Sequence, residues 1–304
     1  MMRIPKKLIS CSLVLILAGC GAPLTTLDTV IEQETLSQTP PPDMRKYRCS
    51  IGAHRGDSNR YTENTLNAIS SAVNNNQFTF IEFDVQYTLD RKIVAYHDKT
   101  LLRLYGSFRK INSLTFDTLK EKTGNNIALY YDVMDVIGRK HINIEIKSSG
   151  DKTADKKLVD QIVQDIKQRG IAEHAMISSI SADVLNYIKT VYPGQKTGQV
   201  FWIDPSTYVP FDFLTENLYN EIQDTGADYL MLHVSNLHNL KDLFKLKPKT
   251  VTLIFWNFDD KMYLVHKDPT DVVWGKSVPL NYVKHYSHSF QQFVKSKAAG
   301  VFNQ

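Results

Sequence analysis

The sequence predicts an α/β fold, namely a (β/α)8 TIM barrel with a hairpin excursion after the second strand. From Arg48 onward, short apolar runs typical of strands alternate with helical patterns, and this alternation calls for a parallel sheet. Eight strand candidates favour a closed barrel over an open sheet. The 304 residues leave room for one such domain, because α/β barrels commonly take about 250 residues.

The strand and helix candidates follow one another in regular order. The expected strands are Cys49–His54, Phe78–Tyr87, Ile142–Lys147, Ala175–Ser179, Thr197–Trp202, Asp228–Leu232, Thr250–Trp256 and, with the weakest pattern, Asp271–Trp274. The expected helices between them are Glu63–Asn75, Thr153–Arg169, Ala182–Val191, Phe213–Thr225 and Asn239–Lys245.

One strand-like run does not fit the alternation. Ile93–His97 follows the second strand after only Leu89-Asp-Arg-Lys92, which is too short for a parallel crossover of a dozen or more residues. We therefore expect 83–88 and 93–97 to form a hairpin at the mouth of the barrel. The stretch 99–138 would then hold a surface excursion and one helix.

Residues 1–19 are expected to be a lipoprotein signal peptide. Three basic side chains in the first seven positions precede the apolar stretch Leu8–Ala18, whose length lies within the ~7–15 residues of a signal core. A membrane-spanning helix needs ~20 residues. Leu17-Ala-Gly-Cys20 resembles the bacterial lipobox, which implies cleavage before Cys20, a diacylglycerol on its sulfur and an acylated (palmitate-type) amino terminus. An ordinary signal peptide with an incidental cysteine is the alternative.

Residues 20–46 are expected to form a lipidated tether, because they are polar, carry Pro40-Pro-Pro42 and lack a hydrophobic period. Residues 47–304 would be the barrel domain. The protein would then be lipid-anchored in the bacterial cell envelope, at the outer membrane or periplasmic face if the host has two membranes. Of the 3 cysteines only Cys49 lies in the barrel domain, so it cannot form an internal disulfide and is expected to be buried packing.

Composition excludes some partners. Apolar residues make up 42% and charged residues 22% of the chain, as in a globular protein with a full core. The net charge of +4 is small and no basic block is visible, which argues against a nucleic-acid partner. No obligate protein partner is evident, and a small-molecule substrate is expected.

Charged residues gather where the first three expected strands end, and barrel active sites lie at the carboxyl ends of strands. These residues are His54, Arg55, Glu82, Asp84, Glu145 and Lys147. Because side chains alternate along a strand, the two acids of the second strand share one face and Ile81, Phe83 and Val85 share the other.

Three of these residues suit a metal. The carboxylates of Glu82, Asp84 and Glu145 would raise one another's pKa if they met without a counter-charge. One divalent cation resolves the repulsion, and an all-oxygen set without thiolate favours Ca²⁺ or Mg²⁺. Beside it, the Arg55 guanidinium can bind phosphate oxygens with two donors and Lys147 can supply a point charge.

Two histidines suit proton transfer. Of the 9 histidines, only His54 and His97 lie next to strand ends in this charged setting. Cleavage of a phosphodiester needs a base for the incoming hydroxyl and an acid for the leaving alkoxide, and histidine serves both near neutral pH. Asp98 would orient His97. Trp256 would either pack or offer a ring on which a glycerol moiety stacks.

Structural explanations remain open at this point. The charged set could be a buried ion-pair network without function. Glu63-Asn-Thr65 could be a helix start with Thr62 as the N-cap, part of the pocket wall, or both.

The same motifs, in the same order, resemble the glycerophosphodiester phosphodiesterase family. They are His54-Arg-Gly56, Glu63-Asn-Thr65, Ile81-Glu-Phe-Asp-Val85, Thr88-Leu-Asp90, Val94-Ala-Tyr-His-Asp98, Leu101 with Arg103, and Asn143-Ile-Glu-Ile-Lys147. The likeness continues more faintly to Trp256 and so covers nearly the whole body from residue 49. It implies a phospholipase-C-like TIM barrel that hydrolyses glycerophosphodiesters to glycerol 3-phosphate and an alcohol.

The resemblance also implies roles. His54 and His97 would be the acid–base pair, Glu82, Asp84 and Glu145 the metal ligands, and Arg55 and Lys147 phosphate contacts. Phospholipase C relatives suggest His54 as base and His97 as acid.

The sequence departs from the family pattern in three places. Thr62 stands where the family usually has proline, and Asn257 follows the tryptophan in place of threonine. The usual closing Gly-Ile-Ile-Thr-Asp-x-Pro pattern is reduced to Val272-Val-Trp-Gly…Pro279. These departures concern the last strand and the alcohol side of the pocket.

Two other functions compete with this reading. A phospholipase C- or D-type enzyme acting on lysophospholipid or sphingolipid would use the same groups. A non-catalytic surface-binding lipoprotein would be expected to have lost a histidine or a carboxylate of the set, and none is missing.

Overall fold

The computed structural model describes residues 46–201, 212–257, 261–267 and 274–280. The expected signal peptide, Cys20 and nearly all of the expected tether lie outside the described residues. Within the described ranges, no helix has both the length and the apolar character needed to cross a membrane.

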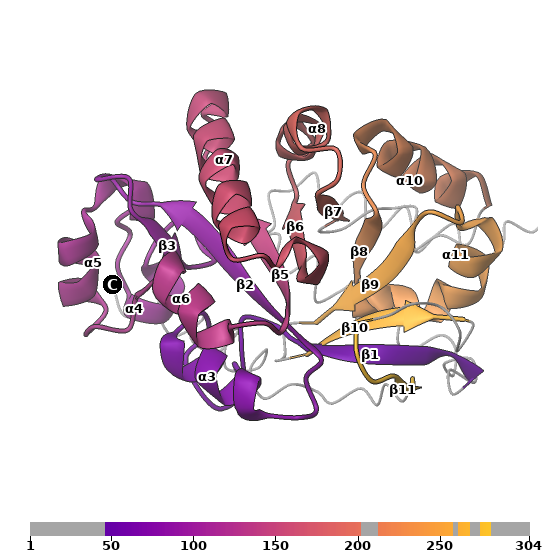
Figure 1. The fold of residues 1–304 in the computed structure, drawn as a ribbon, viewed down its shortest axis with the longest axis horizontal. Coiled ribbons are helices and arrows are strands. Elements are labelled where there is room, and N and C mark those ends of the chain that lie inside the picture. Colours follow the sequence, from indigo (N-terminus) through magenta and orange to yellow (C-terminus); the bar gives the residue numbers. More distant parts are fainter. Residues whose placement is uncertain (1–45, 202–211, 258–260, 268–273, 281–304) are drawn as a thin grey trace, which may run out of the picture. The chain divides into compact units, whose positions relative to one another are not determined.

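Eight strands close into a barrel (Figure 1), as the sequence predicted. They are β1 (Arg48–Ala53), β2 (Phe80–Tyr87), β5 (His141–Ile146), β6 (Ala175–Ser179), β7 (Lys196–Val200), β8 (Tyr229–His233), β9 (Thr252–Trp256) and β10 (Lys261–His266). Closure comes from β1, which pairs with β2 on one side and with β10 on the other.

The eighth strand differs from the expectation. The sequence pointed to Asp271–Trp274, of which 271–273 lie outside the described residues, whereas the strand that closes the barrel is β10. It runs antiparallel to both β9 and β1, while the other barrel strands pair in parallel. Only residues 257–260 separate β9 from β10, which is too short for a parallel crossover, so the pair forms a hairpin. A two-residue strand, β11 (Val278–Pro279), pairs with the start of β1.

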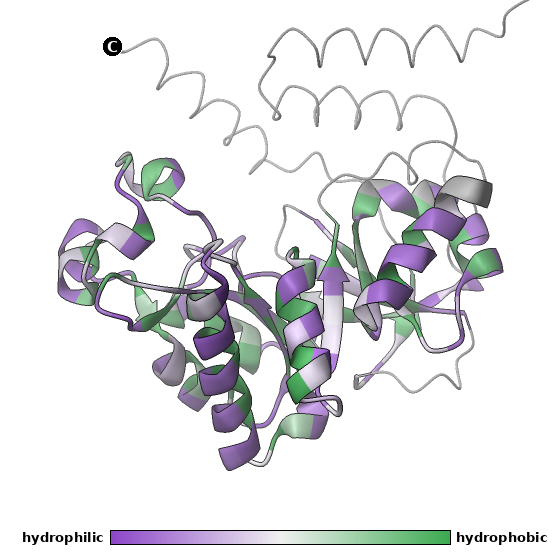
Figure 2. Ribbon diagram, turned by 90° about the horizontal axis from the view of Figure 1, so that it is seen from above, coloured by the Kyte–Doolittle hydropathy of each residue, from purple (hydrophilic) through white to green (hydrophobic). Residues whose placement is uncertain are grey.

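Helices cover the outside of the barrel. They are α3 (Leu66–Asn74), α6 (Tyr130–Ile137), α7 (Lys152–Gln168), α8 (Ala182–Val191), α10 (Asp212–Thr225) and α11 (Leu240–Leu246), with short 3-10 turns η3 (Ala172–His174) and η4 (Val234–Asn239). Figure 2 shows hydrophilic and hydrophobic residues interleaved along these helices. Leu158, Ile162 and Ile166 of α7 are buried, as expected when one side of a helix faces the strands.

The caps explain two helix starts. The Asp151 side chain accepts hydrogen bonds from Thr153 N and Ala154 N at the start of α7, an arrangement worth about 1 kcal/mol. At the start of α3 the cap is Thr65, whose side chain accepts from Ala68 N. The expectation that Thr62 would be the N-cap was wrong, because the helix begins at Leu66, three residues later than predicted.

The predicted hairpin is confirmed. The end of β2 pairs antiparallel with β3 (Ile93–Ala95) through Val85 opposite Ala95 and Tyr87 opposite Ile93. Beyond it lie α4 (Leu102–Tyr105), η2 (Ile111–Ser113), α5 (Phe116–Lys122) and β4 (Ala128–Leu129) before α6. The stretch 99–138 therefore holds three helices where one was expected, because α4 and α5 span only one or two turns and give a weak periodic signal.

This stretch has a small core of its own. Its buried members are Val94, Tyr96, Leu101, Ile111, Leu114, Leu119 and Ile127. The excursion is therefore a packed unit beside the end of β2 (Figure 1) and holds the residues after β3 in place.

An apolar cluster fills part of the barrel interior. Phe80, Met176, Met231, Ile254 and Met262 belong to one buried cluster contributed by five strands. A Cβ on Gly52 of β1 would lie 2.2 Å from the Phe80 ring, so only glycine leaves room for this packing. Ile81, Phe83 and Val85 lie in the separate core beneath the helices, as predicted, which leaves Glu82 and Asp84 on the inner face of β2.

His233 at the end of β8 gives the fold a dependence on pH. Burial lowers the pKa of His233 to about 4, against about 6.5 in an unfolded chain. The folded state thus binds this proton less tightly than the unfolded state. Its contribution to stability is complete above about pH 6.5 and is lost as the pH falls from there through 4, where the loss has reached about 3 kcal/mol.

We expect His233→Gln to flatten the fall in unfolding free energy between pH 6.5 and 4, measured by urea titration at each pH. The wild type supplies the reference slope, which includes the carboxylates that titrate in the same range. An identical slope in the two proteins would contradict the expectation.

Candidate active site

Three carboxylates meet at the mouth of the barrel. Glu82 and Asp84 come from β2 and Glu145 from β5, and all three are buried. One oxygen from each lies within 4.8 Å of the others. Asp84 and Glu145 are direct partners in the parallel β2–β5 ladder, so the sheet register itself brings them together.

The donor set fits a divalent cation. Glu82 Oε1 is buried and has no hydrogen-bond partner, and leaving such an atom unsatisfied costs on the order of 1–3 kcal/mol. All candidate ligand atoms are carboxylate oxygens, which Ca²⁺ and Mg²⁺ prefer. A cation shared by Glu82, Asp84 and Glu145 would satisfy Glu82 Oε1 and offset the crowded negative charge.

The pKa values of Glu82 and Asp84 are shifted in opposite directions. Burial and the charges of Asp84 and Glu145 raise the pKa of Glu82 well above its ordinary value. Burial acts in the same direction on Asp84, but Lys147, the His97 imidazole and Arg55 outweigh it and hold the pKa of Asp84 far below its usual range. Glu82 therefore needs added positive charge nearby to stay ionised.

The loop after β1 is shaped around Glu82. Arg55 and Gly56 both have left-handed backbone angles, with φ of 59° and 78°. This turn lets Arg55 N donate to Glu82 Oε2 at 2.7 Å and Gly56 N donate to Glu82 O at 3.2 Å. A Cβ on Gly56 would lie 2.7 Å from the Ala68 backbone, so glycine is required there. His54 Nε2 is thereby placed 3.9 Å from Glu82 Oε2.

His97 follows β3 and lies near enough to Asp84 to feel its charge. Its Nδ1 is 2.6 Å from Asp98 Oδ1, and Asp98 Oδ2 accepts a hydrogen bond from Arg103 Nε at 2.7 Å. Asp98 therefore orients the ring, as the sequence suggested, and leaves Nε2 for proton transfer. Burial, together with the charges of Arg55 and Lys147, lowers the pKa of His97 in spite of opposing contributions from Asp84 and Asp98.

Glu63 joins the two halves of the site. Its carboxylate accepts from Arg55 Nη1 at 2.9 Å and from Arg103 Nη1 at 2.7 Å. Burial opposes ionisation, but the two arginines outweigh it and lower the pKa of Glu63 to about 2. The sequence reading of Glu63 as a helix start or pocket wall missed this bridge. Arg103, six residues after the nearest predicted strand, was given no role from the sequence.

Asn64 is a second residue that sequence reasoning missed. Its Nδ2 donates to Asp84 Oδ2 at 2.8 Å, and its Oδ1 accepts from Asp84 N at 3.0 Å. Its φ of 59° is left-handed, a conformation that asparagine tolerates better than most residues. Asparagine therefore suits this position for two reasons: it tolerates the left-handed backbone, and its amide makes both hydrogen bonds to Asp84.

The Lys147 ammonium contacts two of the three carboxylates. Lys147 Nζ lies 3.0 Å from Asp84 Oδ1 and donates a hydrogen bond to Glu145. Those charges raise the pKa of Lys147 although burial opposes them. The ammonium is therefore charged at the centre of the site, within reach of any anion that enters beside the carboxylates.

Trp256 ends β9 and is buried against two histidines. Its ring centroid is 6.3 Å from that of His54 and 4.9 Å from that of His233. It therefore supports His54 through packing. Cys49 is buried in β1, and burial raises the pKa of its thiol to about 12, in keeping with the expected packing role.

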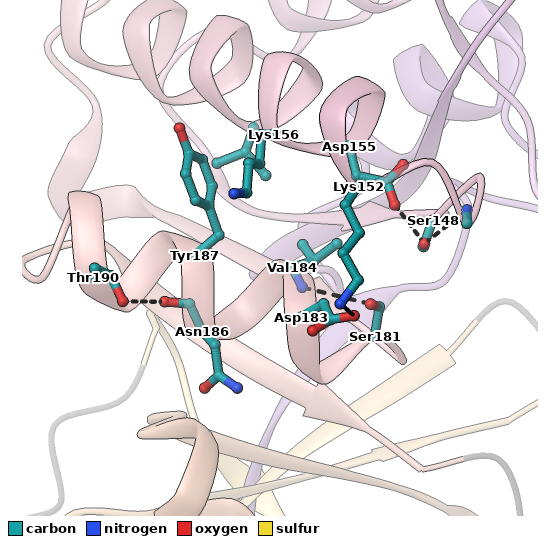
Figure 3. Close-up of a pocket in the computed structure, with 12 residues that line it drawn as sticks. Ser148, Lys152, Asp155, Lys156, Ser181, Asp183, Val184, Asn186, Tyr187 and Thr190 are labelled. Carbon is teal, nitrogen blue, oxygen red and sulfur yellow. Dashed lines mark hydrogen bonds and ion pairs between the residues drawn. The ribbon is translucent and has the colours of Figure 1, made fainter.

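A second concave region lies outside the barrel, between α7 and α8 (Figure 3). This cavity of about 360 Å³ is lined by residues such as Ser148, Lys156 and Tyr187. Lys152 reaches Asp183 across it at 2.9 Å, an exposed pair of small energetic weight. None of the predicted site residues lines the cavity, so the carboxylate cluster is the candidate site.

The chain matches a family model described as the glycerophosphoryl diester phosphodiesterase family over residues 54–296. A glycerophosphodiester phosphodiesterase of Caldanaerobacter subterraneus is 32% identical over 161 residues, which are 49% of this chain and 65% of that protein. A human lysophospholipase D is 26% identical over 57% of this chain and 60% of that protein. The matches thus span less than two thirds of the length of either relative.

Solved structures resemble the fold. A glycerophosphodiester phosphodiesterase of Thermotoga maritima is 27% identical with a TM-score of 0.54, covering 69% of this chain and 87% of that one. A phosphodiesterase of Oleispira antarctica, solved in complex with the product sn-glycerol-3-phosphate, is 20% identical with a TM-score of 0.54, covering 66% and 81%. At that identity the second likeness shows the fold alone.

Proposed function

Because the chain belongs to the glycerophosphoryl diester phosphodiesterase family, we propose that it hydrolyses glycerophosphodiesters to glycerol 3-phosphate and an alcohol. One observation carries the proposal. Three carboxylates meet within 4.8 Å at the barrel mouth, with His54 beside Glu82 and the oriented His97 near enough to Asp84 to feel its charge. A structural ion-pair network would have no need to leave Glu82 Oε1 without a partner.

In this proposal His54 and His97 move the protons. One ring takes a proton from the attacking hydroxyl or water, and the other gives a proton to the departing alkoxide. The lowered pKa of His97 keeps the resting ring neutral. A phosphate anion arriving beside the ring would raise that pKa again, so His97 can serve as the acid once substrate is bound.

Glu82, Asp84 and Glu145 would hold one divalent cation, Ca²⁺ or Mg²⁺. Such an ion supplies charge neutralisation for a phosphate oxygen. Arg55 and Lys147 would contact the remaining phosphate oxygens, since both are held beside the carboxylates as permanent cations. Trp256 would bound the glycerol side of the site next to His54.

We further propose that Cys20 carries the lipid that tethers this domain in the cell envelope of a bacterium. The support is the sequence pattern alone, which combines a basic start, an apolar core and Leu17-Ala-Gly-Cys20. Metabolic labelling with a radioactive fatty acid tests it, because Cys20→Ser should abolish the label.

The hydrolysis is tested with a panel of glycerophosphodiesters that differ in the alcohol. Glycerol 3-phosphate release is followed by a coupled dehydrogenase assay, first in EDTA and then with Ca²⁺ or Mg²⁺ restored. The proposal expects no release in EDTA and recovery with one of the ions. Full release in EDTA, or no release from any diester with either ion, would refute it.

The human lysophospholipase D among the relatives supports a second candidate, hydrolysis of intact lysophospholipid by the same groups. Glycerophosphocholine and lysophosphatidylcholine offered side by side separate the two. A preference for the lysolipid in kcat/KM would favour the second candidate.

Arg103 is expected to act as a positioning residue. Arg103→Gln removes its bonds to Asp98 and Glu63, which lets the His97 ring lose its fixed orientation. We expect kcat for glycerophosphocholine to fall about 10–100-fold with little change in KM, since misplacement of a reacting group costs rate more than binding. The acidic limb of the pH–rate profile should move as well, because Arg103 helps to hold Asp98 ionised.

Arg109→Gln is the matched control, since Arg109 is an exposed arginine on the same excursion. Its kinetics and pH profile should equal those of the wild type. An Arg103→Gln enzyme whose kcat and pH profile are both unchanged would show that Arg103 plays no part in positioning.

A further inference from the structure

Residues 99–111 are the first part of the excursion 99–138 and are here named the basic excursion. They form a closed tip directly after His97 and Asp98. Leu101 N donates to Arg109 O at 3.1 Å and Ile111 N donates to Lys99 O at 3.0 Å, so the two arms are joined along their length. Between the arms lie α4 and Gly106, which turns the chain with a left-handed φ of 66°. The tip therefore has a defined backbone.

The tip leaves an aromatic side chain in solvent although a core lies beneath it. Leu101 and Ile111 of the arms are fully buried in the small core of the excursion. Phe108 is 72% exposed, and Leu102 is also exposed. These two residues flank the Leu101–Arg109 pair, so both lie at the same end of the arms.

The charge around the exposed apolar residues has one sign. Lys99, Arg109 and Lys110 are exposed, and no acidic residue occurs between Lys99 and Phe116. Arg103, the remaining cation of the excursion, is already paired with Asp98 and Glu63. The one acid next to these cations in the sequence, Asp98, is paired with Arg103 and His97. The tip therefore presents a phenylalanine and three exposed cations, a combination that suits a negatively charged lipid–water interface.

We propose that the basic excursion docks on the surface of an anionic phospholipid bilayer. Phe108 enters the boundary between headgroups and acyl chains, and Lys99, Arg109 and Lys110 lie against lipid phosphates. Through Arg103 the same segment holds Asp98 and hence His97, so docking sets the His97 side of the barrel mouth towards the lipid. The docking rests on the exposed surface and is independent of the proposed hydrolysis.

The test places a fluorophore at the tip of the full chain. Phe108→Trp protein is mixed with vesicles of phosphatidylcholine, with or without phosphatidylglycerol, whose acyl chains carry bromine as a short-range quencher. Emission is compared with that of the wild type, which reports the native tryptophans. We expect excess quenching of Phe108→Trp only in vesicles with phosphatidylglycerol.

Two variants make the result decisive. Val191→Trp puts the same fluorophore at an exposed apolar position of α8 and should show no excess quenching. Arg109→Glu combined with Lys110→Glu should weaken binding to phosphatidylglycerol vesicles about tenfold or more, because reversing two charges lowers the net charge of the tip by four units. The proposal is overturned if Phe108→Trp is quenched no more than Val191→Trp, or equally with and without phosphatidylglycerol.

Failure here is separate from failure of the hydrolysis. Quenching needs no turnover, so it can occur in a protein that cleaves nothing. Phe108→Ala should in turn keep wild-type hydrolysis of glycerophosphocholine in free solution, while losing binding to the anionic vesicles.

Discussion

Replacing His54 with alanine is expected to lower kcat for glycerophosphocholine about 10²–10⁴-fold, the range that removal of a general acid or base produces. The ring stands 3.9 Å from Glu82 Oε2 and packs against Trp256, and alanine carries no group that could transfer a proton from that position. Affinity for the metal should persist, since Glu82, Asp84 and Glu145 are untouched.

The control for this variant is His141→Gln. His141 begins β5 and so lies at the opposite end of the barrel from the site. Its kcat should stay within about twofold of the wild type. A His54→Ala enzyme that keeps wild-type turnover, with its fold intact by circular dichroism, would remove His54 from the mechanism.

Replacing Glu82 with glutamine is expected to abolish hydrolysis and to change stability in opposite directions with and without metal. In EDTA, burial and the charges of Asp84 and Glu145 disfavour ionised Glu82, so a neutral amide should leave the melting temperature equal or higher. With Ca²⁺ or Mg²⁺ in excess the wild type should gain stability through binding, and the variant should gain little or none.

Melting temperatures measured in EDTA and across a metal titration test both effects. Glu173→Gln is the matched control, because Glu173 is an exposed glutamate on η3. It should follow the wild type in both series. A Glu82→Gln protein that is stabilised by metal as strongly as the wild type would show that the ion binds elsewhere.

The parts of the fold and site that could be predicted from the sequence depend on local patterns. The alternation of apolar and acidic residues in β2 placed Glu82 and Asp84 on one face, and the structure has Ile81, Phe83 and Val85 on the other. The short connection after Tyr87 predicted the β2–β3 hairpin by length alone. Barrel geometry then implied that residues at the carboxyl ends of different strands would meet.

The parts that could not be predicted depend on pairing at a distance. No local sequence pattern indicates that the Glu63 carboxylate binds two arginines, one of them 40 residues away along the chain. The antiparallel direction of β10 is set by its short link to β9, and its apolar pattern is the same for either direction. The weak pattern at Asp271–Trp274 drew the prediction to the wrong segment. The left-handed turns at Arg55 and Asn64 likewise follow from their bonds to Glu82 and Asp84, which the sequence does not display.

The most direct test is a calorimetric titration of Ca²⁺ and Mg²⁺ into the full chain and into Glu82→Gln, Asp84→Asn and Glu145→Gln. If the three carboxylates share one ion, the wild type binds one equivalent of at least one of the two metals, and each variant loses that binding. Tight binding that survives in any of the three variants, or hydrolysis by a wild type that binds neither metal, would contradict a shared cation at the barrel mouth.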